Sequence, residues 1–159
     1  MYDIGMLFEV IPPHPGQNIA LIVDDAHHES VSKLVDFSHT IEANLYIKYL
    51  QMPHAYHDAL IHEESFSFDN AVYNSKSLQY DFLFLLADLD DVSRLKEISK
   101  KIYRAIKNAA NLFIVVKKQD ADMVAMLLEE NNFVAINTID LDAEYDAISA
   151  KKMHGWMRV

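Results

Sequence analysis

Apolar residues along this chain follow two kinds of pattern, and the two kinds alternate. Short runs in which apolar residues are continuous, or alternate with polar ones, predict β-strands. These runs occupy residues 18–25, 43–50, 65–73, 80–91 and 112–118. Segments with apolar residues three or four positions apart predict amphipathic helices. These segments occupy residues 28–40, 52–64, 92–110 and 120–132.

The end of the chain departs from this alternation. Residues 133–142 and 145–156 have the pattern of two strands joined by a short acidic turn, so we predict an antiparallel hairpin. Alternating strands and helices favour a mostly parallel sheet with helices on both faces. The sequence therefore predicts a three-layer, Rossmann-like α/β domain at residues 18–159, with a C-terminal antiparallel hairpin and an N-terminal extension at residues 1–17.

Composition and charge narrow the classes of function. The chain has 159 residues, a formal net charge of -10 and no cysteine, which excludes disulfides and thiolate chemistry. The acidic balance disfavours nucleic acid and anionic membranes as partners. The N-terminus lacks the pattern of a signal peptide, and no apolar run approaches the roughly 20 residues that span a bilayer. We therefore expect a cytoplasmic protein.

Two segments of the second half carry a family resemblance. The apolar run YDFLFLLADLDD begins at Tyr80, and MLLEENNFVAINTIDL runs from helix into strand, with Asn132 where glycine is usual. In these segments the sequence resembles the class I S-adenosylmethionine-dependent methyltransferases, including the spermidine-synthase-like group. The resemblance implies a central sheet with one antiparallel strand inserted near its end.

The resemblance also implies where a cofactor would bind. Asp69 and Asn70 fall where the family contacts the adenine. Asp24, Asp25 or His28 would lie near the amino-acid end of the cofactor. Asp88 would lie near the transferred methyl group, which makes it the catalytic candidate of a methyltransferase.

The loop after the first strand departs from the family pattern. The family has a glycine-rich turn there, whereas this chain has two carboxylates and two imidazoles at residues 24–28, and none of its three glycines follows an internal strand. Side chains crowd the approach of a ligand to the backbone. The second strand is followed by Gln51 in place of the acid that holds the ribose. We therefore expect no cofactor and favour a non-catalytic binding or interaction module. The alternative is an active methyltransferase that binds S-adenosylmethionine through an atypical loop.

A second alternative starts from the tetrapeptide IVDD, which ends at Asp25. It looks like the opening of response-regulator receiver domains, whose paired acids hold magnesium beside a phosphorylated aspartate. Asp69 would be that aspartate, and Lys117 or Lys118 would supply the lysine. This hypothesis describes a regulatory domain that responds to metal and phosphate.

Two groups of side chains have the donor types that a metal ion prefers. The first comprises Asp24, Asp25 and His27. The second lies on the helix predicted at 52–64 and comprises His54, His57, Asp58 and His62. Neither spacing matches a strong metal signature. Both groups have a plain alternative as helix-capping or solvent-exposed residues.

Two features indicate a protein partner or a homo-oligomer. The predicted helix from Arg94 to Lys107 carries six basic residues against one Glu97, and Lys100, Arg104 and Lys107 share a face of it. Trp156 near the C-terminus would mark an interface if exposed. The alternatives are an ordinary solvated helix face and a tryptophan that closes the core.

Overall fold

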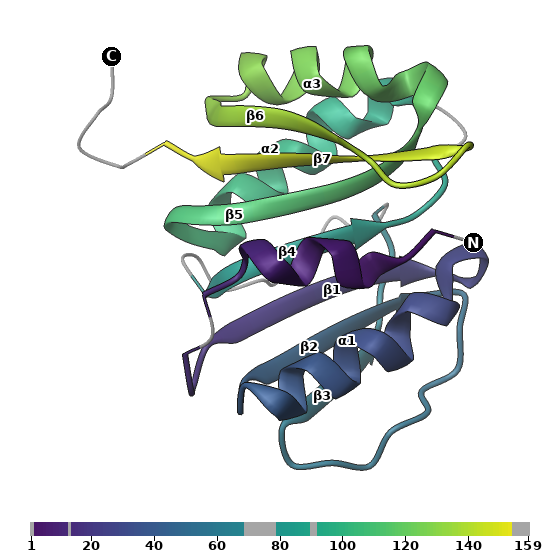
Figure 1. Ribbon diagram of the computed structural model, residues 1–159, viewed down its shortest axis with the longest axis vertical. Coiled ribbons are helices and arrows are strands. Elements are labelled where there is room, and N and C mark those ends of the chain that lie inside the picture. Colours follow the sequence, from purple (N-terminus) through teal and green to yellow (C-terminus); the bar gives the residue numbers. More distant parts are fainter. Residues whose placement is uncertain (1, 13, 69–78, 90–91, 154–159) are drawn as a thin grey trace.

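The fold is built on one seven-stranded sheet with the strand order β3-β2-β1-β4-β5-β7-β6 (Figure 1). The computed structural model describes residues 2–12, 14–68, 79–89 and 92–153. Neighbouring strands from β3 to β5 are parallel, whereas β7 is antiparallel to both β5 and β6. This arrangement confirms the predicted α/β sheet and its C-terminal hairpin. The strands are β1 Asn18–Asp24, β2 Asn44–Leu50, β3 Ile61–Ser65, β4 Tyr80–Leu86, β5 Ile106–Lys117, β6 Phe133–Asp140 and β7 Tyr145–Lys152.

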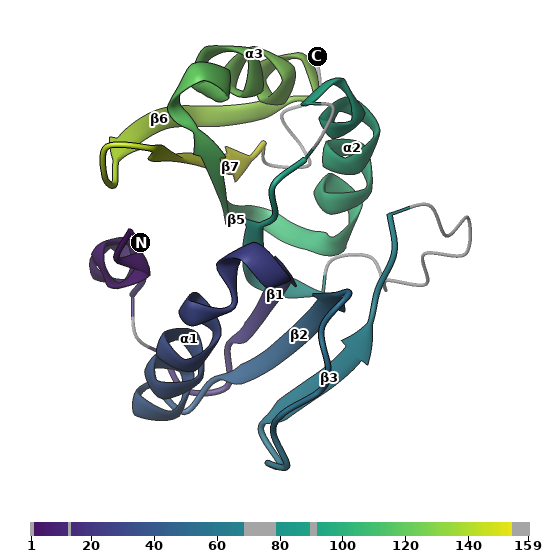
Figure 2. The same ribbon diagram turned by 90° about the vertical axis from the view of Figure 1, so that its right-hand side faces the viewer.

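Helices cover both faces of the sheet (Figure 2). One face is covered by the helix α1 (Glu29–Thr40) and the 3-10 helix η1 (Ile4–Val10). The other face is covered by α2 (Leu95–Ala105) and α3 (Ala121–Glu130). Short 3-10 turns precede these helices, namely η2 (Asp25–His27), η3 (Val92–Arg94) and η4 (Lys118–Asp120). Within the described residues, no helix combines the length and the apolar composition that crossing a membrane requires.

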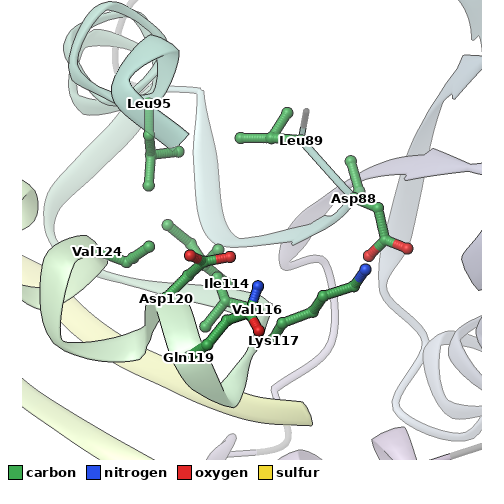
Figure 3. Close-up of a pocket in the computed structure, with 10 residues that line it drawn as sticks. Asp88, Leu89, Leu95, Ile114, Val116, Lys117, Gln119, Asp120 and Val124 are labelled. Carbon is green, nitrogen blue, oxygen red and sulfur yellow. The ribbon is translucent and has the colours of Figure 1, made fainter. Parts of the chain in front are cut away.

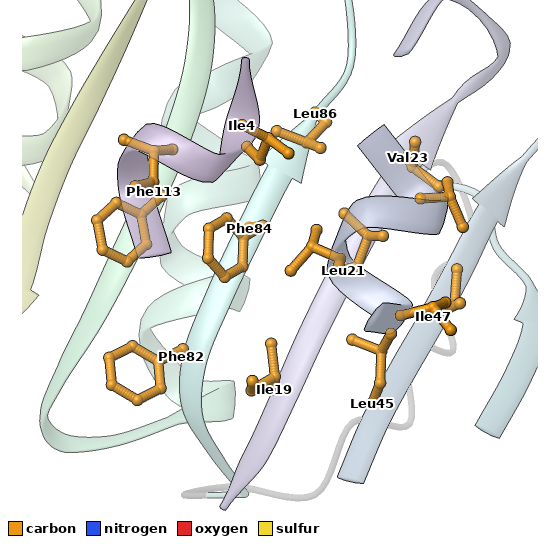
Figure 4. Packing of buried hydrophobic residues seen from close by; sticks show 14 of the residues in the cluster. Ile4, Ile19, Leu21, Val23, Leu45, Ile47, Phe82, Phe84, Leu86 and Phe113 are labelled. Atoms are coloured by element: carbon orange, nitrogen blue, oxygen red, sulfur yellow. The ribbon is translucent and has the colours of Figure 1, made fainter. Parts of the chain in front are cut away.

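The central strands bury side chains on both faces, which explains their continuous apolar runs. Successive residues of a strand point to opposite faces, so Leu21 packs in the cluster under α1 and η1 while Ile22 packs in the cluster under α2. Phe84 is fully buried, and its ring stacks on that of Phe113 with centroids 4.9 Å apart. Figure 4 shows both rings beside Ile4 of η1. The core therefore extends across the middle of the sheet on both sides.

The N-terminal segment packs on the body of the domain. Ile4 and Leu7 of η1 are fully buried against the sheet. Phe8 stacks on Phe37 of α1 with ring centroids 4.3 Å apart. This packing places Tyr2 near the carboxyl ends of the parallel strands, where it becomes part of the site described below.

The prediction of a helix at residues 52–64 is wrong. Residues 52–60 form a connection without regular structure, and the strand β3 begins at Ile61 and pairs with β2. One side chain explains the outcome: the carboxylate of Glu63 accepts hydrogen bonds from the Tyr49 hydroxyl and from the backbone N–H groups of Ala55 and Tyr56. The strand predicted at 65–73 is also misplaced, because β3 ends at Ser65. Residues 69–73 lie outside the described part of the chain.

The helix predicted at 92–110 is too long. Helix α2 ends at Ala105, and β5 begins at Ile106, which pairs with Tyr80 of β4. Ala109 has a φ of 64°, outside the helical region. The helix predicted at 120–132 is confirmed as α3, with Asn131 as its C-cap.

Candidate functional site

The loop that follows β1 lies at the carboxyl edge of the parallel strands, where open α/β sheets place their ligands. The loop winds into the 3-10 turn η2 and leads directly into α1. Its central feature is His27, whose side chain is turned inward and is fully buried. Asp25 and His28 are exposed, and Nδ1 of His28 is 2.9 Å from the backbone oxygen of Asp25. The turn therefore presents Asp25 and His28 to solvent and directs His27 to the core.

Both ring nitrogens of His27 have hydrogen-bond partners. Nε2 lies 2.8 Å from Oδ1 of Asp88, and Nδ1 lies 2.8 Å from the hydroxyl oxygen of Tyr2. An ionised carboxylate only accepts hydrogen bonds, so Nε2–H donates to Asp88. In the neutral imidazole Nδ1 is then an acceptor, and the Tyr2 hydroxyl donates to it. The Tyr2 oxygen in turn accepts a hydrogen bond of 3.3 Å from the Ser30 hydroxyl.

Asp88 follows β4 and receives a second donor from β7. The hydroxyl oxygen of Tyr145 lies 3.2 Å from Oδ1 and 3.1 Å from Oδ2 of Asp88. Burial and the charge of Asp88 raise the pKa of Tyr145 well above its usual range. Burial raises the pKa of Tyr2 to about 12. Both phenols therefore stay protonated at neutral pH and act as hydrogen-bond donors.

Asp24, the last residue of β1, ties its strand to the residue after β4. Its Oδ2 accepts a hydrogen bond of 2.7 Å from the backbone N–H of Asp88. Its Oδ1 is buried, and no donor of the described residues reaches it. A buried acceptor without a partner is costly. This oxygen is therefore an unsatisfied acceptor in the interior of the loop.

A pocket of about 330 Å³ lies between the carboxyl ends of β4 and β5 (Figure 3). Asp88, which contacts His27 of the β1 loop, also lines this pocket. Its apolar wall is formed by Leu95 of α2, Ile114 of β5 and Val124 of α3. Polar side chains surround its opening, and these are Asp88, Lys117, Gln119 and Asp120. Neither the β1 loop nor the residues that follow β2 line this pocket.

The cofactor residues implied by the resemblance do not form one group. Asp24 and Asp88 are brought together, whereas Asp25 and His28 are exposed on the outside of the turn. Gln51 follows β2, is exposed and has a φ of 62°. Asp69 and Asn70 lie outside the described residues, so their role in adenine binding stays a prediction.

Most of the residues proposed as metal ligands have other partners. His54 stacks on Tyr49, and His62 stacks on Tyr46. Asp58 instead lies 2.9 Å from Nε2 of His39, and His57 is exposed. In the part of the chain that the structure describes, no group of three or more histidine and acidic side chains is placed to hold a metal ion.

The basic residues predicted on one helix lie on three elements, η3, α2 and β5. Lys107 belongs to β5, where its Nζ lies 3.1 Å from Oδ1 of Asp81. Lys100 lies 3.5 Å from Glu97 along α2, and Arg104 is exposed in the last turn of that helix. The prediction that Lys107 shares a helix face with them is therefore wrong. Docking of a partner here stays a prediction, and so does any role of Trp156, which lies outside the described residues.

Comparisons with known proteins identify the fold. No protein-family model and no curated protein matches the sequence. Among solved structures, an S-adenosylmethionine-dependent methyltransferase from Aquifex aeolicus is similar, with a TM-score of 0.69 and 12% identity over 94% of this chain and 89% of that one. A second such enzyme, from Mesorhizobium loti, has a TM-score of 0.70 and 11% identity over 93% and 96% of the two chains. Phosphoethanolamine N-methyltransferase 2 from Haemonchus contortus, solved with S-adenosylmethionine, has a TM-score of 0.70 and 10% identity over 95% of this chain and 52% of that one.

This likeness confirms the fold that the resemblance implied. The chain has the class I S-adenosylmethionine-dependent methyltransferase fold, with β7 inserted antiparallel between β5 and β6. The receiver-type alternative disagrees with it, since that doubly wound fold has the strand order 2-1-3-4-5. The two lysines considered for the receiver-type site also have other surroundings. Lys118 pairs with Asp140 and Asp146, and Lys117 lines the pocket.

The residues of the β1 loop do not fit S-adenosylmethionine in the pose that the family fold implies. A glycine-rich turn would let the cofactor approach the backbone, but here the turn packs on the buried ring of His27. The two oxygens of Asp88 already accept hydrogen bonds from His27 and Tyr145. Sequence reasoning missed both tyrosines, because Tyr2 and Tyr145 are far from the loop in sequence and match no motif.

Proposed function

We propose that this chain is a non-catalytic module with a methyltransferase fold, which acts by binding a ligand or a partner and not by transferring a methyl group. The observation that carries the proposal is the burial of His27, with both ring nitrogens engaged, inside the turn that would meet the cofactor. Opening this turn would break two hydrogen bonds in a desolvated site, and each lost bond that leaves a buried group unsatisfied costs about 1–3 kcal/mol. Cofactor binding would have to offset that cost.

The state of Asp88 also supports the proposal. A catalytic carboxylate beside the transferred methyl group needs an oxygen that faces the acceptor. Asp88 instead has Oδ1 shared between His27 and Tyr145, and Oδ2 close to the Tyr145 hydroxyl. Its carboxylate therefore joins the β1 loop to β7 and stabilises the carboxyl edge of the sheet.

The direct test is whether S-adenosylmethionine or S-adenosylhomocysteine stabilises the full chain. A ligand that binds only the folded state at about 100 times its Kd adds about 2.7 kcal/mol of stability. For a domain of this size each kcal/mol raises the Tm by about 2–4 °C. We expect neither compound to shift the Tm or to release heat in calorimetry. A saturable shift would contradict the proposal.

One observation favours the alternative of an active enzyme with an atypical loop. The buried Oδ1 of Asp24 has no donor among the described residues, and the ammonium group of a methionine moiety would supply one. If S-adenosylmethionine does bind, Asp24→Asn should weaken it strongly. Asp25→Asn is the matched control, because Asp25 is exposed on the same turn. Binding that survives Asp24→Asn would remove the support for this alternative.

A further inference from the structure

We propose that two copies of this chain associate by placing the basic outer face of α2 of one copy against the acidic outer face of α3 of the other. The outer face of α3 comprises its five exposed residues, namely Asp122, Met123, Met126, Glu129 and Glu130. Met126 lies three or four positions from each of the other four, so all five share one face of the helix. The helix contains no lysine or arginine, and no described residue forms an ion pair with the three acids. This face therefore carries uncompensated negative charge.

Two large apolar side chains lie exposed in the middle of this acidic face. Met123 is 52% exposed and Met126 is 62% exposed. They lie about one helical turn apart, so they form one apolar patch. Burial of apolar area is favourable, and the flexible methionine side chain adapts to the shape of an opposing surface. The face therefore fits a partner helix that supplies both hydrocarbon and positive charge.

The outer face of α2 in a second copy has this chemistry. Lys96, Lys100 and Arg104 are exposed and follow one another at four-residue intervals, so they form a basic stripe. Glu97 is the only acid of α2 and lies 3.5 Å from Lys100, whereas Lys96 and Arg104 have no ion pair with any described residue. Lysine and arginine can bury their hydrocarbon stems while the charged ends stay in polar surroundings. The stems would cover the two methionines, and the charged ends would reach the surrounding acids.

The two faces match in length and are opposite in charge. Lys96 to Arg104 and Asp122 to Glu130 each span eight positions, or about 12 Å along a helix. Both helices lie on the same face of the sheet (Figure 2), so each copy presents the basic and the acidic half of the contact. Contact of α2 with α2, or of α3 with α3, would bring like charges together, which is unfavourable. The charges therefore select the contact of α2 with α3.

This inference goes beyond the proposed function and does not depend on it. Neither helix contributes a residue to the loop at positions 24–28 or a hydrogen-bond partner to His27. The association is measured without any adenosyl compound. A chain that remains monomeric would therefore contradict this inference alone, and binding of S-adenosylmethionine would contradict the proposed function alone.

The first test is sedimentation velocity of the full chain over protein concentrations from about 1 μM to about 1 mM, at an ionic strength of about 0.15 M. The net charge of -10 repels two copies at long range, but at this ionic strength interactions beyond about 8 Å are screened while charges in contact still attract. We expect a reversible rise in mass from one chain toward two. The dissociation constant should increase at least about tenfold in about 1 M salt, where the screening length is about 3 Å. A chain that stays monomeric throughout would overturn the inference.

Charge reversal identifies the two faces. Lys96→Glu with Lys100→Glu makes the outer faces of both helices mainly acidic, and Glu129→Lys with Glu130→Lys makes both mainly basic. Both pairs of changes agree with the helix dipole, because the acids enter the first half of α2 and the lysines enter the last turn of α3. We expect each double variant alone to remain monomeric where the unmodified chain associates, and an equimolar mixture of the two to form a one-to-one complex. A mixture that stays monomeric, or a variant that associates like the unmodified chain, would refute the contact of α2 with α3.

The matched control is Glu9→Lys with Asp36→Lys, which changes the net charge by the same amount as the α3 variant. Both acids are exposed, on η1 and α1, and these helices cover the opposite face of the sheet. The control should associate like the unmodified chain. Equal weakening by the control and the α3 variant would mean that net charge governs the association, and it would count against the inference.

Discussion

The Nε2 atom of His27 lies 2.8 Å from Oδ1 of Asp88, and this hydrogen bond joins the loop after β1 to the end of β4. The two residues are 61 positions apart in the sequence. The ring of His27 is fully buried, and Tyr2 holds its other nitrogen. An imidazole thus fills the interior of the turn after β1, and it links three segments of the chain.

The first prediction concerns the stability that His27 contributes. His27→Ala removes a buried ring and leaves the Tyr2 hydroxyl and one oxygen of Asp88 short of a partner. We expect the free energy of unfolding to fall by about 2–4 kcal/mol, from the cavity and the unsatisfied groups together. Urea denaturation measures this change. His28→Ala is the control, because that side chain is exposed and should change stability by less than about 0.5 kcal/mol. Equal effects of the two variants would show that the buried network adds nothing.

The second prediction isolates the contact between Tyr2 and His27. Tyr2→Phe keeps the aromatic ring, which also packs against Tyr145 at 5.4 Å. It removes the only described donor to Nδ1 of His27, so we expect a loss of about 1–2 kcal/mol at neutral pH. Tyr56→Phe serves as the control, since its half-buried hydroxyl has no hydrogen-bond partner among the described residues. A Tyr2→Phe variant as stable as the unmodified chain would place the hydroxyl outside the network.

The third prediction follows from the raised pKa of Tyr2, which is about 12 in the folded chain against 10.0 for an unperturbed tyrosine. Below the lower of these values both states hold the proton, and the full stability is present. Between the two values the unfolded chain loses its proton while the folded chain keeps it, so stability falls as the pH rises. A difference of one pKa unit corresponds to about 1.36 kcal/mol, so Tyr2 should account for a loss of about 2 kcal/mol over this window.

Tyr2→Phe separates this contribution from those of the other tyrosines. The variant has no ionisable group at position 2, so its stability should fall less steeply between about pH 10 and about pH 12. Tyr145, whose pKa is also raised, contributes to the slope of both proteins and cancels in the comparison. The measurement is the free energy of unfolding in urea at several alkaline pH values. Parallel curves for the two proteins would contradict the burial of Tyr2.

The sequence predicts the central strands well and the connections poorly, for a physical reason. Strands β1 and β4 are buried on both faces, so their apolar runs are continuous and cannot be mistaken for surface elements. The start of β5 is different, because Ile106 continues the apolar spacing of the preceding helix. Pairing with Tyr80 on β4 decides its conformation, and such a contact between distant residues overrides local propensity. The prediction for residues 52–60 is wrong for a similar reason, because the Glu63 carboxylate accepts hydrogen bonds from the backbone of Ala55 and Tyr56.

The candidate site is likewise only partly predictable from the sequence. The acidic and histidine-rich loop is visible in the sequence, and so is its position after the first strand. The direction of each side chain is not visible, because it depends on what covers the loop. Tyr2 reaches His27 only because η1 packs its buried residues on the sheet. The imidazole that sequence reasoning considers as a metal ligand thereby becomes a core residue.

The last prediction concerns Asn132, which stands where the resemblance leads one to expect glycine. Its φ of 70° lies in the left-handed region, immediately after the C-cap of α3. Glycine adopts this conformation without strain, asparagine tolerates it, and alanine pays roughly 1–2 kcal/mol for it. We therefore expect Asn132→Gly to keep or raise the stability by up to about 1 kcal/mol, and Asn132→Ala to lower it by about 1 kcal/mol. The order glycine, asparagine, alanine should appear in urea midpoints. An alanine variant as stable as the glycine variant would mean that the helix ends in another conformation, and the entry of the chain into β6 would have to be different from the one described.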